Sequence, residues 1–199
     1  MKSTGVMALA LHIQNCPLRS LYLSKNGITD AGVEALAKAL PASKLEVLDL
    51  SSQFIGDKGA GALAKALLEG SQLSDLRLTG HNDVHLAGAT SLAAALSRGV
   101  ALKHLYLAIN PPSKGALETL ATALPKSQLI SLEVRIPSVQ CGEMAALARL
   151  GQVLNVLHLV VLCCADFIAI PFHVFTSPSS HSTCGSGKNC REANCKLCV

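Results

Sequence analysis

The sequence contains no tryptophan, and its aromatic side chains are limited to four phenylalanines and two tyrosines among 199 residues. A hydrophobic core therefore has to be built from aliphatic side chains, which favours a regular, layered interior. Charged residues make up only 15% of the chain, with a formal net charge of +4. Because this small excess is spread along the whole sequence, the basic stripe that indicates nucleic-acid binding is missing.

Cysteines are sparse over most of the chain. Only Cys16 and Cys141 precede residue 163, whereas the other cysteines crowd into residues 163–199. This distribution excludes a disulfide framework for the whole chain and favours a cytoplasmic location. The apolar fraction of 50% also excludes a chain that is disordered throughout.

A repeated pattern of leucines covers most of the sequence. The spacing L-x-x-L-x-L-x-x-N-x-I, followed by a glycine and two further leucines, starts at residue 18 and again at 45, 73, 102, 129 and 154. The hexapeptide Ala-Leu-Ala-Lys-Ala-Leu starts at both Ala35 and Ala62. In each repeat the second and third leucines alternate as in a strand, whereas the later leucines have helical spacing. Each repeat is therefore predicted to form a strand, a turn and a helix.

No single repeat can bury its own leucines, so neighbouring repeats have to stack. The predicted fold class is α/β, a solenoid with a curved parallel sheet inside and helices outside. Asn26, Asn82 and Asn110 lie where the chain leaves the strands, and their amides can satisfy backbone groups of the adjacent turn. Gln53 and Pro137 depart from this pattern. We expect a local distortion at both of these turns and the weakest repeat at Pro137.

The pattern resembles the leucine-rich repeat of the ribonuclease-inhibitor type, a family that includes the repeat regions of NOD-like receptors and the Ran GTPase-activating proteins. The resemblance covers roughly residues 5–160, and repeat starts 25 to 29 residues apart suit the strand and full helix of that type. It implies a leucine-rich-repeat solenoid. It is specific for the fold and not for an activity.

Residues 1–13 have two interpretations. Lys2 and the apolar run of residues 5–11 are typical of a secretory signal, but Gly5, Leu9 and Ile13 keep the phase of the repeat helices. We favour the helix, because no cleavage motif follows. The chain would then begin inside a solenoid, so we expect a piece of a longer protein or a shortened isoform.

The sequence changes character after residue 159. Residues 1–162 are predicted to form the leucine-rich-repeat domain, with a partial first repeat and about five further repeats, and residues 163–199 a Cys-rich, largely disordered tail. A membrane span over residues 153–175 is disfavoured, because Asp166 near its middle costs about 3 kcal/mol on insertion. We therefore expect no membrane association.

The tail offers two weak candidates for ligand binding. Cys184, Cys190, Cys195 and Cys198 supply enough thiolates for one zinc ion, but only the last two form a C-x-x-C pair. The segment 185–188 resembles a phosphate loop, although positions 182 and 189 lack the required glycine and hydroxyl residue. We expect neither a metal nor a cofactor.

No nucleophile or metalloprotease motif accompanies the histidines, so we do not expect an enzyme. What remains is the concave face, defined as the surface formed by strand residues that point away from the leucine core. Its central row is predicted to contain Tyr22, Asp49, Arg77, Tyr106, Glu133 and His158. A flanking row is predicted to contain Ser20, Val47, Asp75, His104 and Ser131. Tyrosine and arginine are frequent in binding hot spots, so Tyr22, Arg77 and Tyr106 are the expected anchoring contacts.

The leading hypothesis is a monomeric, non-catalytic protein–protein interaction module that binds another protein on this concave face. It could serve as the recognition part of a NOD-like-receptor-type regulator. The alternative is a GTPase-activating protein for a Ran-type small GTPase, with Arg135 after the fifth strand as the nearest candidate for an arginine finger. The short solenoid and the lack of an acidic C-terminal run argue against this alternative.

Overall fold

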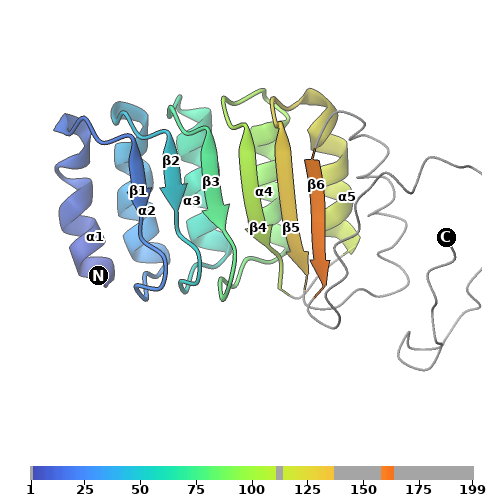
Figure 1. Cartoon of the computed structure of the whole chain (residues 1–199), viewed down its shortest axis with the longest axis horizontal. Coiled ribbons are helices and arrows are strands. Elements are labelled where there is room, and N and C mark those ends of the chain that lie inside the picture. Colours follow the sequence, from blue (N-terminus) through green and yellow to red (C-terminus); the bar gives the residue numbers. More distant parts are fainter. Residues whose placement is uncertain (1, 111–113, 137–157, 164–199) are drawn as a thin grey trace, which may run out of the picture.

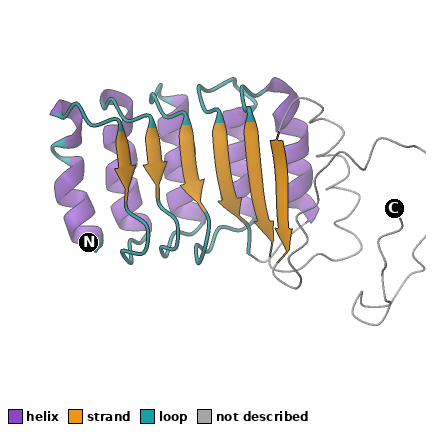
Figure 2. Cartoon of the chain, viewed as in Figure 1, coloured by secondary structure: helices purple, strands orange, loops and turns teal. Residues whose placement is uncertain are grey.

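Strands and helices alternate along the chain, as the repeats predict (Figures 1 and 2). The computed structural model describes residues 2–110, 114–136 and 158–163. The strands are β1 (Ser20–Tyr22), β2 (Val47–Asp49), β3 (Asp75–Leu78), β4 (His104–Ala108), β5 (Ser131–Ile136) and β6 (His158–Cys163). The α-helices are α1 (Ser3–Ala10), α2 (Asp30–Ala39), α3 (Asp57–Leu68), α4 (Leu86–Leu96) and α5 (Lys114–Ala123). Short 3₁₀ turns are η1 (Ile13–Asn15), η2 (Leu40–Ala42) and η3 (Leu124–Lys126).

The strands form one parallel sheet in the order β1-β2-β3-β4-β5-β6. Figure 1 shows helices α1 to α5 in a second layer behind this sheet, each beside the helix of the next repeat. No described element covers the front of the sheet, as Figure 2 makes clear. The predicted α/β leucine-rich-repeat solenoid, with the parallel sheet inside and helices outside, is confirmed.

A single column of leucines runs through the sheet. Strand register pairs Leu21 with Leu48, Leu48 with Leu76, Leu76 with Leu105, Leu105 with Leu132, and Leu132 with Leu159. Leu48, Leu76, Leu105 and Leu132 have no exposed surface. Burial of each such side chain stabilises the fold by about 2 kcal/mol. This burial requires the neighbouring repeat, because each leucine packs between two adjacent repeats.

The sixth strand corrects one prediction. The sequence pattern places Leu157 in the leucine column, but Leu159 pairs with Leu132, so the register of β6 differs from the predicted one by two residues. Consequently Val160 pairs with Glu133, and His158 pairs with Ser131 in the flanking row. A shift of two residues leaves every residue on the same side of a strand, so hydrophobic alternation alone cannot distinguish the two registers.

Buried amide side chains join successive turns. The Oδ1 of Asn82 accepts the backbone N–H groups of Gln53 and Ile55, both at 3.2 Å, and its Nδ2 donates to the carbonyl of Leu50 at 2.9 Å. Asn82 thus satisfies three backbone groups of the preceding repeat, as the sequence predicts.

Gln53 makes the same bonds to its own preceding turn, so the amide contacts are kept at a turn where a local distortion was expected. Its Oε1 accepts the backbone N–H groups of Asn26 at 3.1 Å and Ile28 at 2.8 Å, and its Nε2 donates to the carbonyl of Leu23. Ser52, which precedes Gln53, has a φ of 55°, close to the 59° of the equivalent Lys25. The longer glutamine side chain therefore reaches the same backbone groups as asparagine, although the next position differs, because Gly27 has a φ of 67° and the equivalent Phe54 has no positive φ.

Asn110 differs from this pattern. Its side chain is exposed, whereas the neighbouring Ile109 has no exposed surface. The backbone N–H of Asn110 donates to the carbonyl of Val84 at 3.0 Å. The apolar Ile109 takes the interior position at this turn, which moves the amide outward. The predicted weak point at Pro137 lies outside the described residues.

The first residue of a helix fixes the start of the next helix. The Oδ1 of Asp57 in α3 accepts the backbone N–H groups of His85 at 2.8 Å and Gly88 at 2.7 Å, at the beginning of α4. The Oδ1 of Asp30 in α2 accepts those of Gly56 at 2.8 Å and Gly59 at 3.0 Å, at the beginning of α3. These carboxylates satisfy N–H groups that a helix leaves without internal partners.

Helix α1 keeps the repeat phase, as favoured from the sequence. Val6, Ala10 and Ile13 are buried and lie 27 positions before Val33, Ala37 and Leu40, which are buried in the next repeat. The Oγ of Ser3 accepts the backbone N–H of Thr29 at 3.0 Å. The N-terminal segment therefore packs as the helix of a repeat.

Within the residues that the structure describes, no helix is long and apolar enough to cross a membrane. The proposed boundary between residues 162 and 163 falls inside β6, and the rest of the Cys-rich tail, residues 164–199, lies outside the described residues.

Candidate partner-binding surface

The sheet brings five of the six predicted central residues into one row. Pairwise register joins Tyr22, Asp49, Arg77, Tyr106 and Glu133 across β1 to β5. The flanking row of Ser20, Val47, Asp75, His104 and Ser131 is also in register. The sixth central position belongs to Val160 instead of His158. Because these positions alternate with the buried leucine columns, the rows form the concave face.

Arg77 occupies the middle of this face and is held in place from two sides. Its Nε donates to Oδ1 of Asp75 at 3.1 Å and its Nη2 to Oδ2 at 3.0 Å, a bidentate pair. The guanidinium carbon lies 5.0 Å from the centre of the Tyr106 ring, which is cation–π geometry.

These contacts further stabilise the charged form of Arg77, which a guanidinium already adopts at neutral pH. Hydrogen bonding to Asp75 raises the pKa of Arg77 above its ordinary value, and the nearby negative charges act in the same direction, whereas partial burial acts against them. The carboxylate of Asp75, whose side chain is 13% exposed, is the better shielded member of the pair. The result is a fixed cation beside a fixed aromatic ring, both reachable from solvent.

A second ion pair lies on β5. The Nε of Arg135 donates to Oε1 of Glu133 at 2.7 Å, and the Arg135 side chain is 47% exposed. The alternative hypothesis needs this guanidinium to reach a phosphate. In the structure its Nε is already engaged by a carboxylate of the same strand.

Tyr22 and Asp49 lie side by side at the other end of the row. Tyr22 is 61% exposed and pairs in register with Asp49. The Oδ1 of Asp49 accepts the backbone N–H of Ser51 at 2.9 Å, which orients the carboxylate. Among the described residues, Asp49 forms no ion pair with a basic side chain.

Phe54, which is 68% exposed at the turn after β2, was not predicted from the sequence as a contact residue. A Cβ added at Gly27 would lie 3.7 Å from its ring, so the phenyl group lies over the preceding turn. A signal was present, because residue 54 stands between the buried Gln53 and Ile55, where alternation directs a side chain outward. An exposed aromatic residue at such a position is a candidate contact residue.

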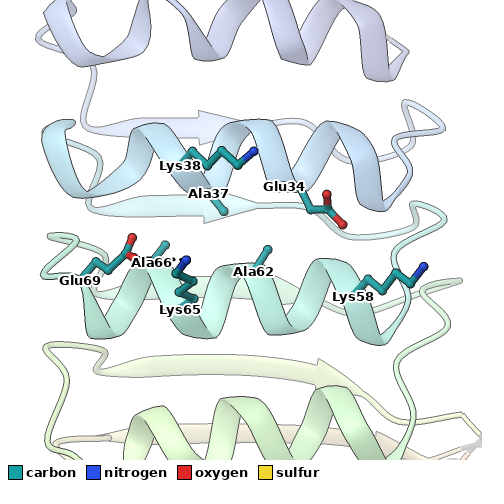
Figure 3. A pocket seen from close by; sticks show the side chains of 8 residues that line it. All are labelled: Glu34, Ala37, Lys38, Lys58, Ala62, Lys65, Ala66 and Glu69. Atoms are coloured by element: carbon teal, nitrogen blue, oxygen red, sulfur yellow. Dashed lines mark ion pairs between the residues drawn. The ribbon is translucent and has the colours of Figure 1, made fainter.

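The opposite side of the molecule has a shallow groove of about 240 Å³ between α2 and α3 (Figure 3). It is lined by Glu34, Ala37, Lys38, Lys58, Ala62, Lys65, Ala66 and Glu69. The alanines allow the helices to approach closely, and the charged side chains extend into solvent around them. The nearest opposite charges, Lys65 and Glu69, are 3.7 Å apart and exposed. This arrangement is typical of a solvated helix surface.

No group of three or more potential metal ligands occurs in the described part of the chain. The four cysteines considered as zinc ligands lie outside the described residues. His104 is half-buried in the flanking row of the concave face. In register it lies between Asp75 and Ser131, and within the described residues its imidazole forms no hydrogen bond with either side chain.

Comparison with known proteins identifies the repeats and the fold. A family model described as Leucine Rich repeat matches residues 14–37 and 42–64. No curated protein matches the sequence. Among solved structures, the chain is similar to one described as "Leiomodin-1 Actin-Binding Site 2 (ABS2)", with 21% identity and a TM-score of 0.55 over 63% of this chain and 73% of that chain. At this identity the likeness concerns the fold alone.

Proposed function

We propose that this chain of leucine-rich repeats is a non-catalytic protein–protein interaction module that binds its partner on the concave face. The observation that supports this proposal most directly is the fixed pair of Arg77 and Tyr106 in the middle of the face. Leucine-rich repeats stack into extended surfaces of the kind that solenoid proteins use for binding.

The arrangement of Arg77 favours recognition because its side chain is already ordered in the free protein, so it loses little rotamer entropy when a partner binds. A free arginine side chain loses considerable rotamer entropy when a complex forms. Here the bidentate pair with Asp75 and the stacking on Tyr106 already restrict it. Its remaining N–H groups can donate to carbonyl or carboxylate oxygens of a partner with little further loss.

The surroundings of this pair are also suitable for an interface. Two exposed aromatic residues lie on the preceding repeats, Tyr22 at 61% exposure in the same row and Phe54 at 68% exposure on the turn after β2. Tyrosine and arginine are the side chains that most often dominate binding energy, particularly when polar groups surround them. We further propose a monomeric, cytoplasmic regulator of the NOD-like-receptor type as the setting of this module.

A pull-down with the full chain tests the proposal. We expect a variant with Tyr22→Ala, Arg77→Ala and Tyr106→Ala to lose its partner. The matched control carries Lys38→Ala, Lys58→Ala and Lys65→Ala on the opposite surface and should retain it. Circular dichroism checks that both variants fold. If the concave-face variant and the control variant recover the same amount of partner, the concave-face proposal is contradicted.

A second experiment tests the alternative activity. Single-turnover GTP hydrolysis by a Ran-type GTPase should not accelerate when the full chain is added at high concentration. An acceleration that disappears with Arg135→Ala would instead support the GTPase-activating function and contradict the non-catalytic one.

A further inference from the structure

We propose that the concave face recognises an arginine side chain of its partner at the corner formed by Tyr22 and Asp49. This inference rests on the proposed function and adds the chemistry of the group that the partner presents. The exposed Tyr22 ring supplies a face for cation–π contact, and Asp49 supplies a carboxylate beside it.

The geometry of the corner follows from the sheet. Tyr22 and Asp49 are register partners on the adjacent parallel strands β1 and β2, so their side chains stand about 5 Å apart at the backbone and project from the same side. The bond from the Ser51 N–H to Oδ1 of Asp49 fixes one carboxylate oxygen at 2.9 Å. A carboxylate can accept additional hydrogen bonds, so Asp49 retains capacity for a partner.

The molecule contains an internal example of the same recognition. Arg77 lies between a carboxylate, Asp75, and an aromatic ring, Tyr106, on the same face. The Tyr22–Asp49 corner also provides a ring and a carboxylate on neighbouring strands, as direct register partners, whereas Asp75 and Tyr106 are offset by two residues. Among the described residues, no guanidinium of this chain occupies it. A guanidinium from a partner would complete the arrangement that Arg77 completes internally.

Charge complementarity also points to a cation. Asp49 and Asp75 both lie beside the cation Arg77, which forms its ion pair with Asp75, so these three residues together carry a net charge of −1. Arg19, which precedes β1, is engaged by Glu46, which precedes β2. Arginine fits better than lysine, because its planar group can stack on the ring while donating along its edge to the carboxylate.

The two tyrosines allow a direct test on the full chain. Incorporation of 3-fluorotyrosine gives two ¹⁹F signals, because Tyr22 and Tyr106 are the only tyrosines. The probe is acetyl-Gly-Arg-Gly-amide, and the matched neutral probe contains citrulline in place of arginine. We expect the arginine peptide to shift the Tyr22 signal in a saturable way and to leave the Tyr106 signal nearly unchanged. The citrulline peptide should bind at least about fivefold more weakly.

The Asp49→Asn variant tests the carboxylate without removing the acceptor for Ser51. We expect its affinity for the arginine peptide to fall about fivefold, whereas Glu69→Gln on the opposite surface should have no effect. The Tyr106 signal reports whether the sheet remains folded. Equal shifts with both peptides, a response confined to Tyr106, or no response at all would overturn the proposal.

Failure of this inference can be distinguished from failure of the proposed function. If the arginine peptide does not bind but the concave triple-alanine variant still loses its protein partner, the face binds a partner through other chemistry. If the peptide binds as expected and that variant retains its partner, the corner recognises arginine but the proposed partner surface is wrong.

Discussion

The backbone N–H of Gln53 donates to Oδ1 of Asn82 at 3.2 Å. Gln53, whose side chain bonds to the turn of the preceding repeat, is therefore itself bonded by the amide of the following repeat. Gln53 then repeats these bonds on the turn of Asn26 with its own amide. Both side chains are almost completely buried, at 1% and 2% exposure. They replace the water that would otherwise solvate the turn backbone.

Replacement of Asn82 by alanine should destabilise the array strongly. The change leaves two backbone N–H groups and one carbonyl without their side-chain partner in a buried turn, and we expect a loss of about 2 to 4 kcal/mol of unfolding free energy. Urea denaturation measures this loss. Asn110→Ala, at an exposed position, should change stability by less than about 0.5 kcal/mol. Equal effects of the two substitutions would show that the amide bonds contribute little.

Asp57→Ala should also be destabilising, because it removes the acceptor for the N–H groups of His85 and Gly88. The expected loss is about 1 to 2 kcal/mol, the range of a helix cap. Thermal unfolding followed by circular dichroism gives the comparison. Asp83→Ala is the control, since that side chain is 68% exposed, and its unfolding curve should match that of the unchanged chain. If Asp57→Ala unfolds at the same temperature as the unchanged chain, water replaces the carboxylate as the acceptor of these N–H groups.

Two helix glycines should respond to alanine in opposite directions. A Cβ at Gly88 would lie 2.7 Å from Oδ1 of Asp57 and 2.9 Å from the Cβ of Ala60, so Gly88→Ala should cost about 1 to 3 kcal/mol. At Gly61 the nearest atom, the Oγ of Ser91, is 3.8 Å away, so Gly61→Ala should gain about 0.5 to 1 kcal/mol in helix propensity. Chemical denaturation of both variants tests the sign of each change.

The packing of α1 can be tested at two neighbouring positions. Val6 has no exposed surface, so Val6→Ala should lower the unfolding free energy by about 2 kcal/mol. Met7 is 45% exposed, and Met7→Ala should have a much smaller effect. Hydrogen exchange of the α1 amides would locate the loss seen with Val6→Ala. The same small effect at both positions would mean that α1 does not stabilise the array.

The repeat period was sufficient to predict the column of Leu48, Leu76 and Leu105, because burial repeats whenever the chain returns to the same strand position. It did not predict the role of Gln53, since a glutamine reaches the same backbone groups only through one extra methylene. The register of His158 was wrong for a different reason. A shift of two residues in β6 preserves the alternation on which the prediction depended.

The concave row was predictable up to Glu133, because alternation alone assigns the outward positions. The contacts made by Arg77 were not. Its choice of Asp75 over Asp49 as the bidentate partner depends on side-chain rotamers within the folded sheet. Phe54 was not predicted, because alternation assigns outward positions within strands and this exposed residue lies on the turn that follows β2.

The two sets of side-chain bonds run in opposite directions along the chain. Asp30 and Asp57 each serve the repeat that follows, whereas Gln53 and Asn82 each serve the repeat that precedes. A repeat in the interior thus depends on both neighbours for groups that it cannot supply itself. Removal of one such repeat would leave backbone N–H and C=O groups of both neighbouring repeats without their side-chain partners. These repeats should therefore unfold together as one cooperative unit.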